Sequence, residues 1–275
     1  MNLPDSPTEG PQTWHHGLMA RYWAERLHAD DDELAYYAGA IERFGEPALD
    51  LCCGAGRILV PLLERGLDVD GVDVSADMLA RSRQLASDRG LQPTLTQQAM
   101  HALDLPRTYR TIFICDSFGI GGGRHEALAA LLRIHAHLAP GGALVFSHDL
   151  PYADDEAEWL RWLPGRRRGK PEPWPSSNER QALDGGEEVE LITRERSFDP
   201  LRQETVLDLR ARLWRGDHIV AQEEHAIVLP AFFAQEVTLL LEAAGFDDIE
   251  IQGRYTGRPA SADDATVVFV AQRRS

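Results

Sequence analysis

Short apolar segments and stretches of helical periodicity alternate along the first half of the chain. The apolar segments cover residues 47–51, 69–74, 94–98, 111–116 and 143–147. Helical spacing of apolar residues occupies residues 57–65, 75–90 and 125–138 between them, and Pro140-Gly141-Gly142 is expected to stop the third helix. Strands that alternate with helices of about 10–15 residues are typical of βαβ units. We therefore predict five parallel strands here, with Ser75 as a helix N-cap.

The two ends of the chain and its later part show other patterns. Residues 14–44 carry helical periodicity with a break near 29–32, which predicts two helices. Residues 188–198, 204–214 and 218–229 alternate between apolar and polar side chains, and Arg215-Gly216-Asp217 has turn composition. These three segments predict an antiparallel sheet. A helix over 232–244 and strands at 249–251 and 266–270 are expected to rejoin the parallel sheet.

The predicted fold class is therefore α/β: a doubly wound, mostly parallel seven-stranded sheet with an inserted antiparallel β-sheet. We expect N-terminal helices and a ligand-binding core in residues 1–150, a linker and antiparallel insert in residues 151–229, and the completion of the core in residues 230–275. Residues 1–12 are polar and rich in proline, which predicts disorder.

Composition narrows the class of protein. The net charge is −16, which disfavours binding to nucleic acid because most of the surface would repel phosphates. No apolar run approaches the roughly 20 residues needed to cross a membrane, and the polar N-terminus does not read as a signal peptide. Three cysteines without metal-ligand spacing fit a reduced, cytoplasmic location. One basic run, residues 166–170, is expected to be a solvated loop, with capture of an anionic substrate as the alternative.

The most informative segment is the loop after the first strand, Leu49-Asp50-Leu51-Cys52-Cys53-Gly54-Ala55-Gly56-Arg57. Its small residues lead from a strand into a helix and allow a ligand to approach the backbone closely. Asp73 ends the following strand. Because adjacent parallel strands end at the same edge of a sheet, the Asp73 carboxylate is expected beside this loop, where it can accept hydrogen bonds from a ribose diol.

Two ligand classes use such a layout. A dinucleotide site requires the pattern G-x-G-x-x-G, but Leu59 occupies the position of the third glycine. An adenosyl sulfonium has no pyrophosphate, carries positive charge, and tolerates a strand-end acid such as Asp50 near the loop. The missing glycine and the acid together favour the sulfonium ligand.

The segment resembles motif I of the class I (Rossmann-like) S-adenosylmethionine-dependent methyltransferases, D-x-G-x-G-x-G, with Asp50, Gly54 and Gly56 in register. Three further segments, Gly71–Ser75, Leu138–Gly142 and Glu242–Phe246, are similar to later motifs of the family in the right order. The resemblance covers residues 45–150 and 230–272. Cys52 replaces the first glycine of motif I, which would cost about 1 kcal/mol or more if that residue needs a positive φ.

The resemblance implies an enzyme that uses S-adenosyl-L-methionine as its cofactor. Gly54 and Gly56 would let the backbone approach the methionine part of the cofactor, with Asp50 near its amino group and Asp73 on its ribose.

It also implies where the adenine ring would lie. Met78 and Met100 would enclose the ring. Gln98 and Ala99 stand where members of the family usually carry an acidic residue that contacts the adenine amino group, so the Gln98 side chain or the Ala99 backbone would have to substitute for it. Asp116, at the end of the fourth predicted strand, completes the expected cofactor-binding set.

Methyl transfer needs alignment above all, and a general base only for a hydroxyl or a protonated amine. Candidate bases follow the fourth and fifth strands: Asp116, Ser117, His148 and Asp149. We predict His148 as the catalytic base, the alternative being a polar turn residue. The glycine-rich residues 118–123 are expected either to face the acceptor or to serve as a linker, and no metal site is predicted.

The expected reaction moves a methyl group to nitrogen or oxygen of a small-molecule acceptor. Similar inserts in small-molecule members of the family cover the active site or build a dimer interface, so a homodimer is one expectation for the insert. Four aromatic residues of the N-terminal helices are expected in the core or closing the pocket: Tyr22, Trp23, Tyr36 and Tyr37. The other functions that remain open are a non-catalytic cofactor-binding or scaffold protein, an NAD-dependent oxidoreductase, and a methyltransferase of nucleic acid or protein.

Overall fold

The computed structural model describes residues 13, 15–26, 28–120, 122–152, 160–165 and 171–274. The expectations for residues 1–12 and for the basic run 166–170 therefore lie outside the described residues. The helices are α1 (Gly17–Arg26), α2 (Asp31–Phe44), α3 (Leu59–Glu64), α4 (Ala76–Ser87), α5 (Arg124–His137) and α7 (Ala234–Ala243), with short 3₁₀ turns η1 (Met100–Ala102) and η2 (Asp184–Gly186).

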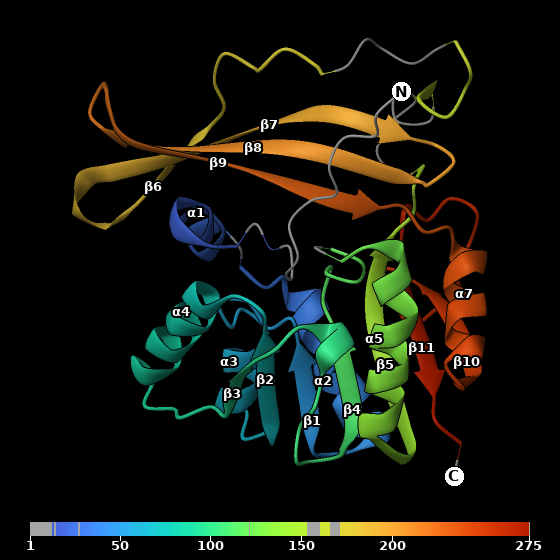
Figure 1. The fold of residues 1–275 in the computed structure, drawn as a ribbon. Coiled ribbons are helices and arrows are strands. Elements are labelled where there is room, and N and C mark those ends of the chain that lie inside the picture. Colours follow the sequence, from blue (N-terminus) through green and yellow to red (C-terminus); the bar gives the residue numbers. More distant parts are fainter. Residues whose placement is uncertain are drawn as a thin grey trace.

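The core is a sheet in the order β10-β11-β5-β4-β1-β2-β3, which confirms the predicted seven-stranded sheet within the described residues (Figure 1). Its strands are β1 (Ala48–Leu51), β2 (Val69–Asp73), β3 (Leu95–Gln97), β4 (Tyr109–Ile114), β5 (Leu138–Asp149), β10 (Asp247–Gly253) and β11 (Thr266–Gln272). The pairs among β1 to β5 are parallel, whereas β11 runs antiparallel to both of its neighbours. The last two strands therefore rejoin the sheet as expected.

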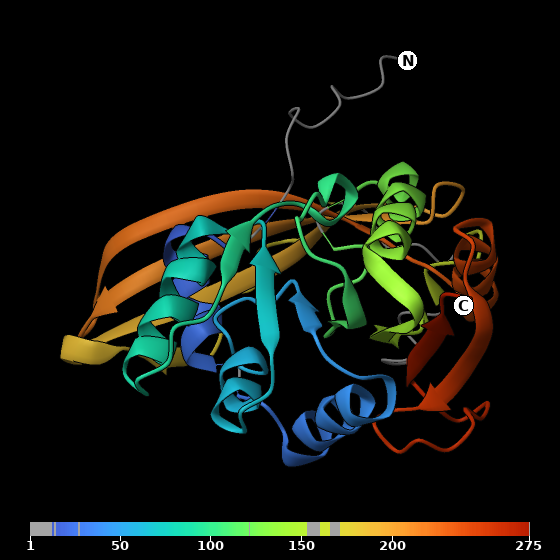
Figure 2. The same cartoon turned by 90° about the horizontal axis from the view of Figure 1, so that it is seen from below.

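Helices cover both faces of this sheet because its strands are apolar on both sides (Figure 2). Leu49, Ile112 and Phe146 point to the face that α5 and α7 cover. Phe113 and Val145, which alternate with them, point to the face covered by α2, α3 and α4. The sheet is therefore doubly wound, and its core forms two layers of apolar side chains.

The start of β5 differs from the sequence expectation. Pro140-Gly141-Gly142 was expected to lie in a turn between a helix and a strand. Instead α5 ends at His137 and β5 begins at Leu138, so these residues form an irregular first segment of the strand, where its register with β4 shifts. Gly141 has a φ of 72°, and a Cβ on Gly142 would lie 2.8 Å from the Arg110 carbonyl oxygen. Pro140 has no backbone N–H to donate to the ladder, and the two glycines after it allow the strand to bulge there.

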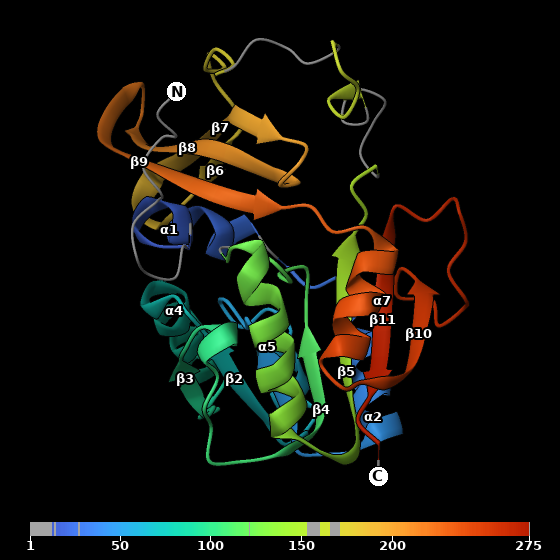
Figure 3. The same ribbon diagram turned by 45° about the vertical axis from the view of Figure 1, so that its right-hand side comes forward.

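The second sheet is antiparallel, in the order β6-β7-β8-β9, and comes from residues between β5 and α7. The long strands β7 (Glu187–Asp199), β8 (Glu204–Arg215) and β9 (His218–Pro230) match the predicted segments, while the short β6 (Arg180–Ala182) was not predicted. Figures 1 and 3 show this sheet above the edge where the parallel strands end, with α1 between the two. Leu18, Met19 and Tyr22 of α1 pack on its apolar face.

None of the helices in the described part of the chain combines the length and apolar character needed to cross a membrane.

Candidate functional site

The loop after β1 is held against the end of β2. The backbone N–H groups of Cys52 and Cys53 both donate to the Val72 carbonyl oxygen, at 2.7 and 2.9 Å. Cys52 has a φ of 68°, so the residue that replaces the first glycine does occupy the left-handed region. Gly56 has a φ of 87°, and a Cβ there would lie 2.6 Å from Ser82 Oγ. The loop therefore turns tightly against α4.

Asp73 is fixed by the backbone around it. Its Oδ2 accepts a hydrogen bond from Gly54 N at 2.9 Å, and its Oδ1 accepts one from Ser75 N at 2.8 Å. Burial raises the pKa of Asp73, and hydrogen bonds from the backbone of Ser75, Gly54 and Val74 partly oppose that shift. Ser75 caps α4 as predicted, because its Oγ accepts a hydrogen bond from Met78 N at 3.2 Å.

Asp50 is a carboxyl group buried at the end of β1, with 2% of its surface exposed. Burial raises its pKa to about 8, against the opposing charge of Arg57 and with the help of Asp73 and Glu33. A positively charged ligand group beside Asp50 would favour the ionised form of this carboxyl and pair with it.

These residues meet at a cavity of about 260 Å³. Its lining includes five of the predicted site residues: Asp50, Gly54, Asp73, Met78 and Asp116. A smaller cavity of about 70 Å³ adjoins it and is lined by Gln98, Ala99 and Met100. Cys52, Val74 and Ile120 line both, so the two cavities form one slot. Gly56 shapes the loop without lining either cavity.

The Gln98 side chain is hydrogen-bonded to the backbone of a neighbouring loop. Its Oε1 accepts a hydrogen bond from Asp104 N at 2.8 Å, and its Nε2 donates to the Asp104 carbonyl oxygen at 3.0 Å. Both ends of the amide are thus engaged, and the Ala99 carbonyl oxygen already accepts a hydrogen bond from Ala102 N at 3.0 Å.

Asp116 lies at the end of β4 with a φ of 52° and a side chain that is 44% exposed. Ser147 Oγ donates to its Oδ1 at 2.6 Å and accepts from its backbone N at 2.8 Å. Tyr255 OH lies 3.4 Å from Oδ1, and Arg57 Nη2 lies 3.3 Å from Oδ2. The carboxylate is therefore braced from three sides and presented to the cavity.

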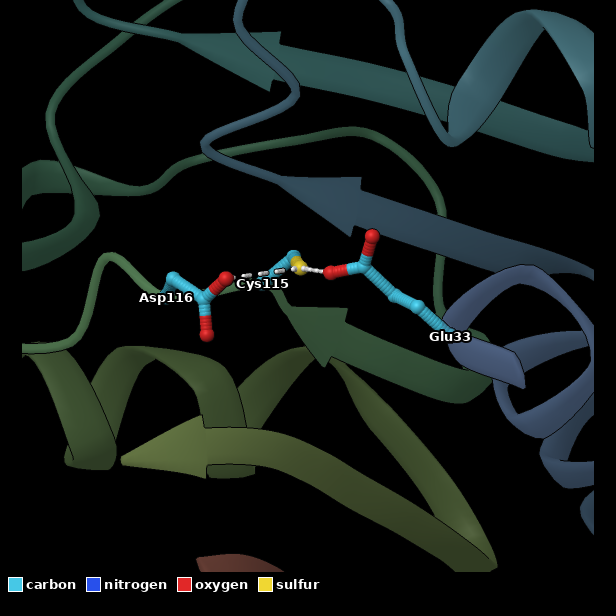
Figure 4. Close-up of side chains that lie close together, drawn as sticks. All are labelled: Glu33, Cys115 and Asp116. Atoms are coloured by element: carbon cyan, nitrogen blue, oxygen red, sulfur yellow. Dashed lines mark hydrogen bonds between the residues drawn. The ribbon is translucent and has the colours of Figure 1, made fainter. Parts of the chain in front are cut away.

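Behind Asp116 lies an ion-pair network that sequence reasoning missed. The Arg57 guanidinium pairs with Glu33, and Cys115 Sγ lies 2.6 Å from Glu33 Oε1 and 3.7 Å from Asp116 Oδ2 (Figure 4). Burial alone would raise the pKa of Glu33, but the hydrogen bond and charge of Arg57 hold it below its usual value. Arg57, directly after Gly56 in the loop, was the available signal. Tyr255 and Glu33 carried none, because α2 and the loop after β10 reach the site only in the folded chain.

His148, the predicted base, is not brought into the slot. It is 8% exposed, its Nε2 lies 2.8 Å from the Phe232 carbonyl oxygen, and its ring contacts Phe118 and Phe269. Burial lowers its pKa. His148 thus lies in an aromatic cluster and lines neither cavity. Asp149 is also outside the lining and accepts a hydrogen bond from Thr266 Oγ1 at 2.6 Å.

The four N-terminal aromatic residues divide between the core and the slot. Tyr37 is fully buried against Phe113, Tyr36 OH donates to Gln252 at 2.7 Å, and Tyr22 packs on the second sheet. Trp23 alone of the four lines the larger cavity among the described residues. Of the glycine-rich segment, residues 118–120 and 122–123 line the smaller cavity, while Gly121 lies outside the described residues.

Comparison with known proteins identifies residues 48–142 with a family model described as a methyltransferase domain. The chain is 32% identical to a dTDP-3-amino-3,6-dideoxy-alpha-D-glucopyranose N,N-dimethyltransferase from Streptomyces fradiae, over 51% of this chain and 56% of that protein. It is 35% identical to a demethylmenaquinone methyltransferase from Thermus thermophilus, over 38% of this chain and 48% of that protein. The chain therefore spans about half the length of these curated relatives.

Solved structures resemble the chain over nearly its whole length. An S-adenosylmethionine-dependent methyltransferase from Clostridium acetobutylicum has a TM-score of 0.71 at 16% identity, covering 93% of this chain and 98% of that one. A sugar N-methyltransferase from Streptoalloteichus has a TM-score of 0.67 at 20% identity, covering 100% and 99%. At these identities the likeness establishes the fold, including the inserted sheet region.

Proposed function

We propose that this chain, which belongs to the class I S-adenosylmethionine-dependent methyltransferases, transfers a methyl group from S-adenosylmethionine to an amino nitrogen of a small-molecule acceptor. The observation that carries the proposal is the convergence of Asp50, Gly54, Asp73 and Met78 on one cavity that continues into a second. Oxygen remains the alternative acceptor atom.

The residues present fit the cofactor. Asp73 offers a buried, pre-oriented carboxylate for a ribose diol, and Asp50 offers a buried carboxyl that an ammonium group would ionise. The loop packs closely against α4, since a Cβ on Gly56 would lie 2.6 Å from Ser82 Oγ and one on Gly54 would lie 3.3 Å from Met78 Cε. Leu59, at the position where a dinucleotide site needs glycine, is fully buried at the start of α3, which disfavours an NAD-dependent oxidoreductase.

When bound, the cofactor supplies an electrophilic methyl group on a sulfonium. The chain itself contributes position: a shaped slot that holds donor and acceptor in line is worth up to about 7–11 kcal/mol in favourable systems. Asp116 is the group that would take the proton of an acceptor ammonium, because its carboxylate faces the larger cavity and is held by Ser147 and Tyr255. The acceptor nitrogen is thereby left with the free electron pair that attack requires.

The acidic lining of the larger cavity and the names of similar proteins both support a nitrogen acceptor. Of the ionisable side chains that line the larger cavity, Asp50, Asp73 and Asp116 are acidic and Arg57, which pairs with Glu33, is basic. A cation beside Asp50 would favour the ionised form of this carboxyl, whose pKa is raised to about 8. Burial, with a smaller contribution from His16, lowers the pKa of His15 to about 4, so its imidazole adds no positive charge at neutral pH. The relative from Streptomyces fradiae is named for an amino sugar, and the structural neighbour from Streptoalloteichus is a sugar N-methyltransferase.

We further propose that residues 151–229 cover the slot, between a core in residues 1–150 and its completion in residues 230–275. Trp23 and Ile120 support this, because both line the larger cavity and pack against the apolar cluster beneath the second sheet. A homodimer built on this sheet is the accompanying proposal, and light scattering on a sizing column tests it. The acidic charge argues against a nucleic-acid partner, and three free cysteines fit a cytoplasmic location.

The function is tested in two steps. Calorimetry with S-adenosylhomocysteine should show binding, while NAD should give neither heat nor a thermal shift. Incubation with S-adenosylmethionine and a panel of amino sugars and phenols should then release S-adenosylhomocysteine with amines. Folded protein that binds neither the methyl donor nor its demethylated form defeats the proposal. If the protein binds the cofactor but forms no S-adenosylhomocysteine with any member of the panel, the non-catalytic alternative is favoured.

A further inference from the structure

The smaller cavity has the character of a site for a flat, mostly apolar ring. Its apolar walls are Met100, Phe118, Ala127 and Ala130. Val74 lines both cavities and connects this one to the larger cavity, where Asp73 lies. If the proposed function holds, the adenine ring of the cofactor is the group that enters here. Adenine carries an exocyclic amino group, and the ligand binds more weakly if this donor is buried without an acceptor.

Two residues expected to meet this amino group do not offer an acceptor side chain. Ala99 has none, and the Gln98 amide is engaged at both ends by Asp104. Glu126, in the first turn of α5, is the one carboxylate among the described residues that line the smaller cavity.

One carboxylate oxygen of Glu126 is hydrogen-bonded within the protein, and the other is left for a ligand. Its Oε2 accepts a hydrogen bond from Gly123 N at 2.9 Å, which forms a capping box with the start of α5. Its Oε1 lies 3.6 Å from His101 Nε2, longer than a hydrogen bond, and the side chain is 30% exposed. Gly122 makes room for the carboxylate, since a Cβ there would lie 2.8 Å from Oε2.

We propose that Glu126 Oε1 accepts the hydrogen bond from the adenine amino group and so selects an adenosyl ligand. The assignment rests on the proposed function. The capping bond fixes which oxygen is left for the ligand, and the neighbouring His101 limits where that oxygen can point. Recognition of the base is thus carried by α5 instead of the segment after β3.

The test exploits the difference between adenine and hypoxanthine, which replaces the amino donor with a carbonyl acceptor. Wild-type protein should bind S-adenosylhomocysteine about 10- to 100-fold more tightly than S-inosylhomocysteine, as expected for a hydrogen bond to a charged group. In Glu126→Gln the amide oxygen can keep the capping bond from Gly123, which turns the NH₂ group toward the ligand. This variant should lose most of the preference or reverse it.

Glu236→Gln is the matched control. Glu236 is the third residue of α7 and forms the same capping box, with its Oε2 accepting from Phe233 N at 2.9 Å, but it lines neither cavity. It should keep the wild-type preference. Gly122→Ala is a second probe, because its Cβ displaces the carboxylate without altering its chemistry, and it should also lower the preference.

The outcomes separate this inference from the function itself. If wild-type protein binds neither nucleoside, the proposed function fails. If it prefers the adenosyl ligand and folded Glu126→Gln keeps the full preference, Glu126 is only a helix cap and the inference is overturned. Should Glu126→Gln not fold, an unchanged preference in Gly122→Ala overturns it equally.

Discussion

Gly54 N donates a 2.9 Å hydrogen bond to Asp73 Oδ2, which ties the loop after β1 to the end of β2. The bond forms within the protein itself, without a ligand. Because Ser75 N holds the other oxygen, the carboxylate has one orientation and presents its remaining lone pairs to the cavity. Pre-orientation of this kind lowers the entropic cost of binding.

Asp73→Asn should weaken S-adenosylhomocysteine binding by about tenfold or more, because an amide can satisfy only one of the two backbone donors and loses a charge-assisted bond. Calorimetry measures the affinity, and thermal denaturation measures the accompanying loss of stability. Asp70→Asn, on the same strand, weakens the bonds that Asp70 Oδ2 accepts from Arg107 and Tyr109 outside the cavities, and it should leave affinity unchanged. Equal affinity in both variants would refute the role of Asp73.

Gly56→Ala should destabilise the fold by about 1–3 kcal/mol, because its φ of 87° and the 2.6 Å approach to Ser82 Oγ act together. Gly90→Ala isolates the backbone part of this cost, since Gly90 has a φ of 72° and nothing within 4 Å of an added Cβ. Chemical denaturation should show a larger loss for Gly56→Ala than for Gly90→Ala. Equal losses would mean that contact with α4 contributes nothing.

Asp50 makes stability depend on pH. Its pKa rises from an ordinary value of 3.8 to about 8, mainly through burial, so the folded state keeps a proton that the unfolded state releases. Stability therefore falls as pH rises through that window and levels off above it. Asp50→Asn removes this term, so the melting temperature of the variant should rise relative to that of wild type as the pH increases from about 5 to about 8. A difference that does not vary with pH would contradict the assignment.

The same variant should bind S-adenosylhomocysteine more weakly, because a neutral amide cannot compensate an ammonium group. A gain in stability together with a loss of affinity is the signature of a functional buried charge. Calorimetry and thermal melts on the same preparation measure both.

Asp116→Asn should lower the turnover of an amine acceptor by about 10²–10⁴-fold, the range for loss of a positioned base. Cofactor affinity should change by less than about threefold, because the amide keeps the bond from Ser147. His148→Leu is the informative comparison: it should retain turnover and lose about 1–3 kcal/mol of stability through the orphaned Phe232 carbonyl. The reverse pattern would restore His148 as the base.

Much of the fold could be predicted from the sequence because its signals are local. The alternation of strands and helices placed Asp50, Gly54 and Asp73 at one sheet edge, since consecutive parallel strands all end on the same side. The cap at Ser75 is equally local, because its bond comes from Met78, three positions along the chain. The bulged start of β5 was not predicted, because it depends on how Gly142 meets Arg110 on a neighbouring strand.

The sequence by itself determined where the slot lies: strand-end acids and small loop residues must converge when βαβ units pack. Only the tertiary structure decided which side chains remain free to act there. Gln98 turns to Asp104, His148 to Phe232, and Tyr255 reaches Glu33 across 222 positions of the chain. The physical reason is that packing sets the hydrogen-bond partners that lie far apart in the chain, and these partners decide which polar atoms remain for a ligand.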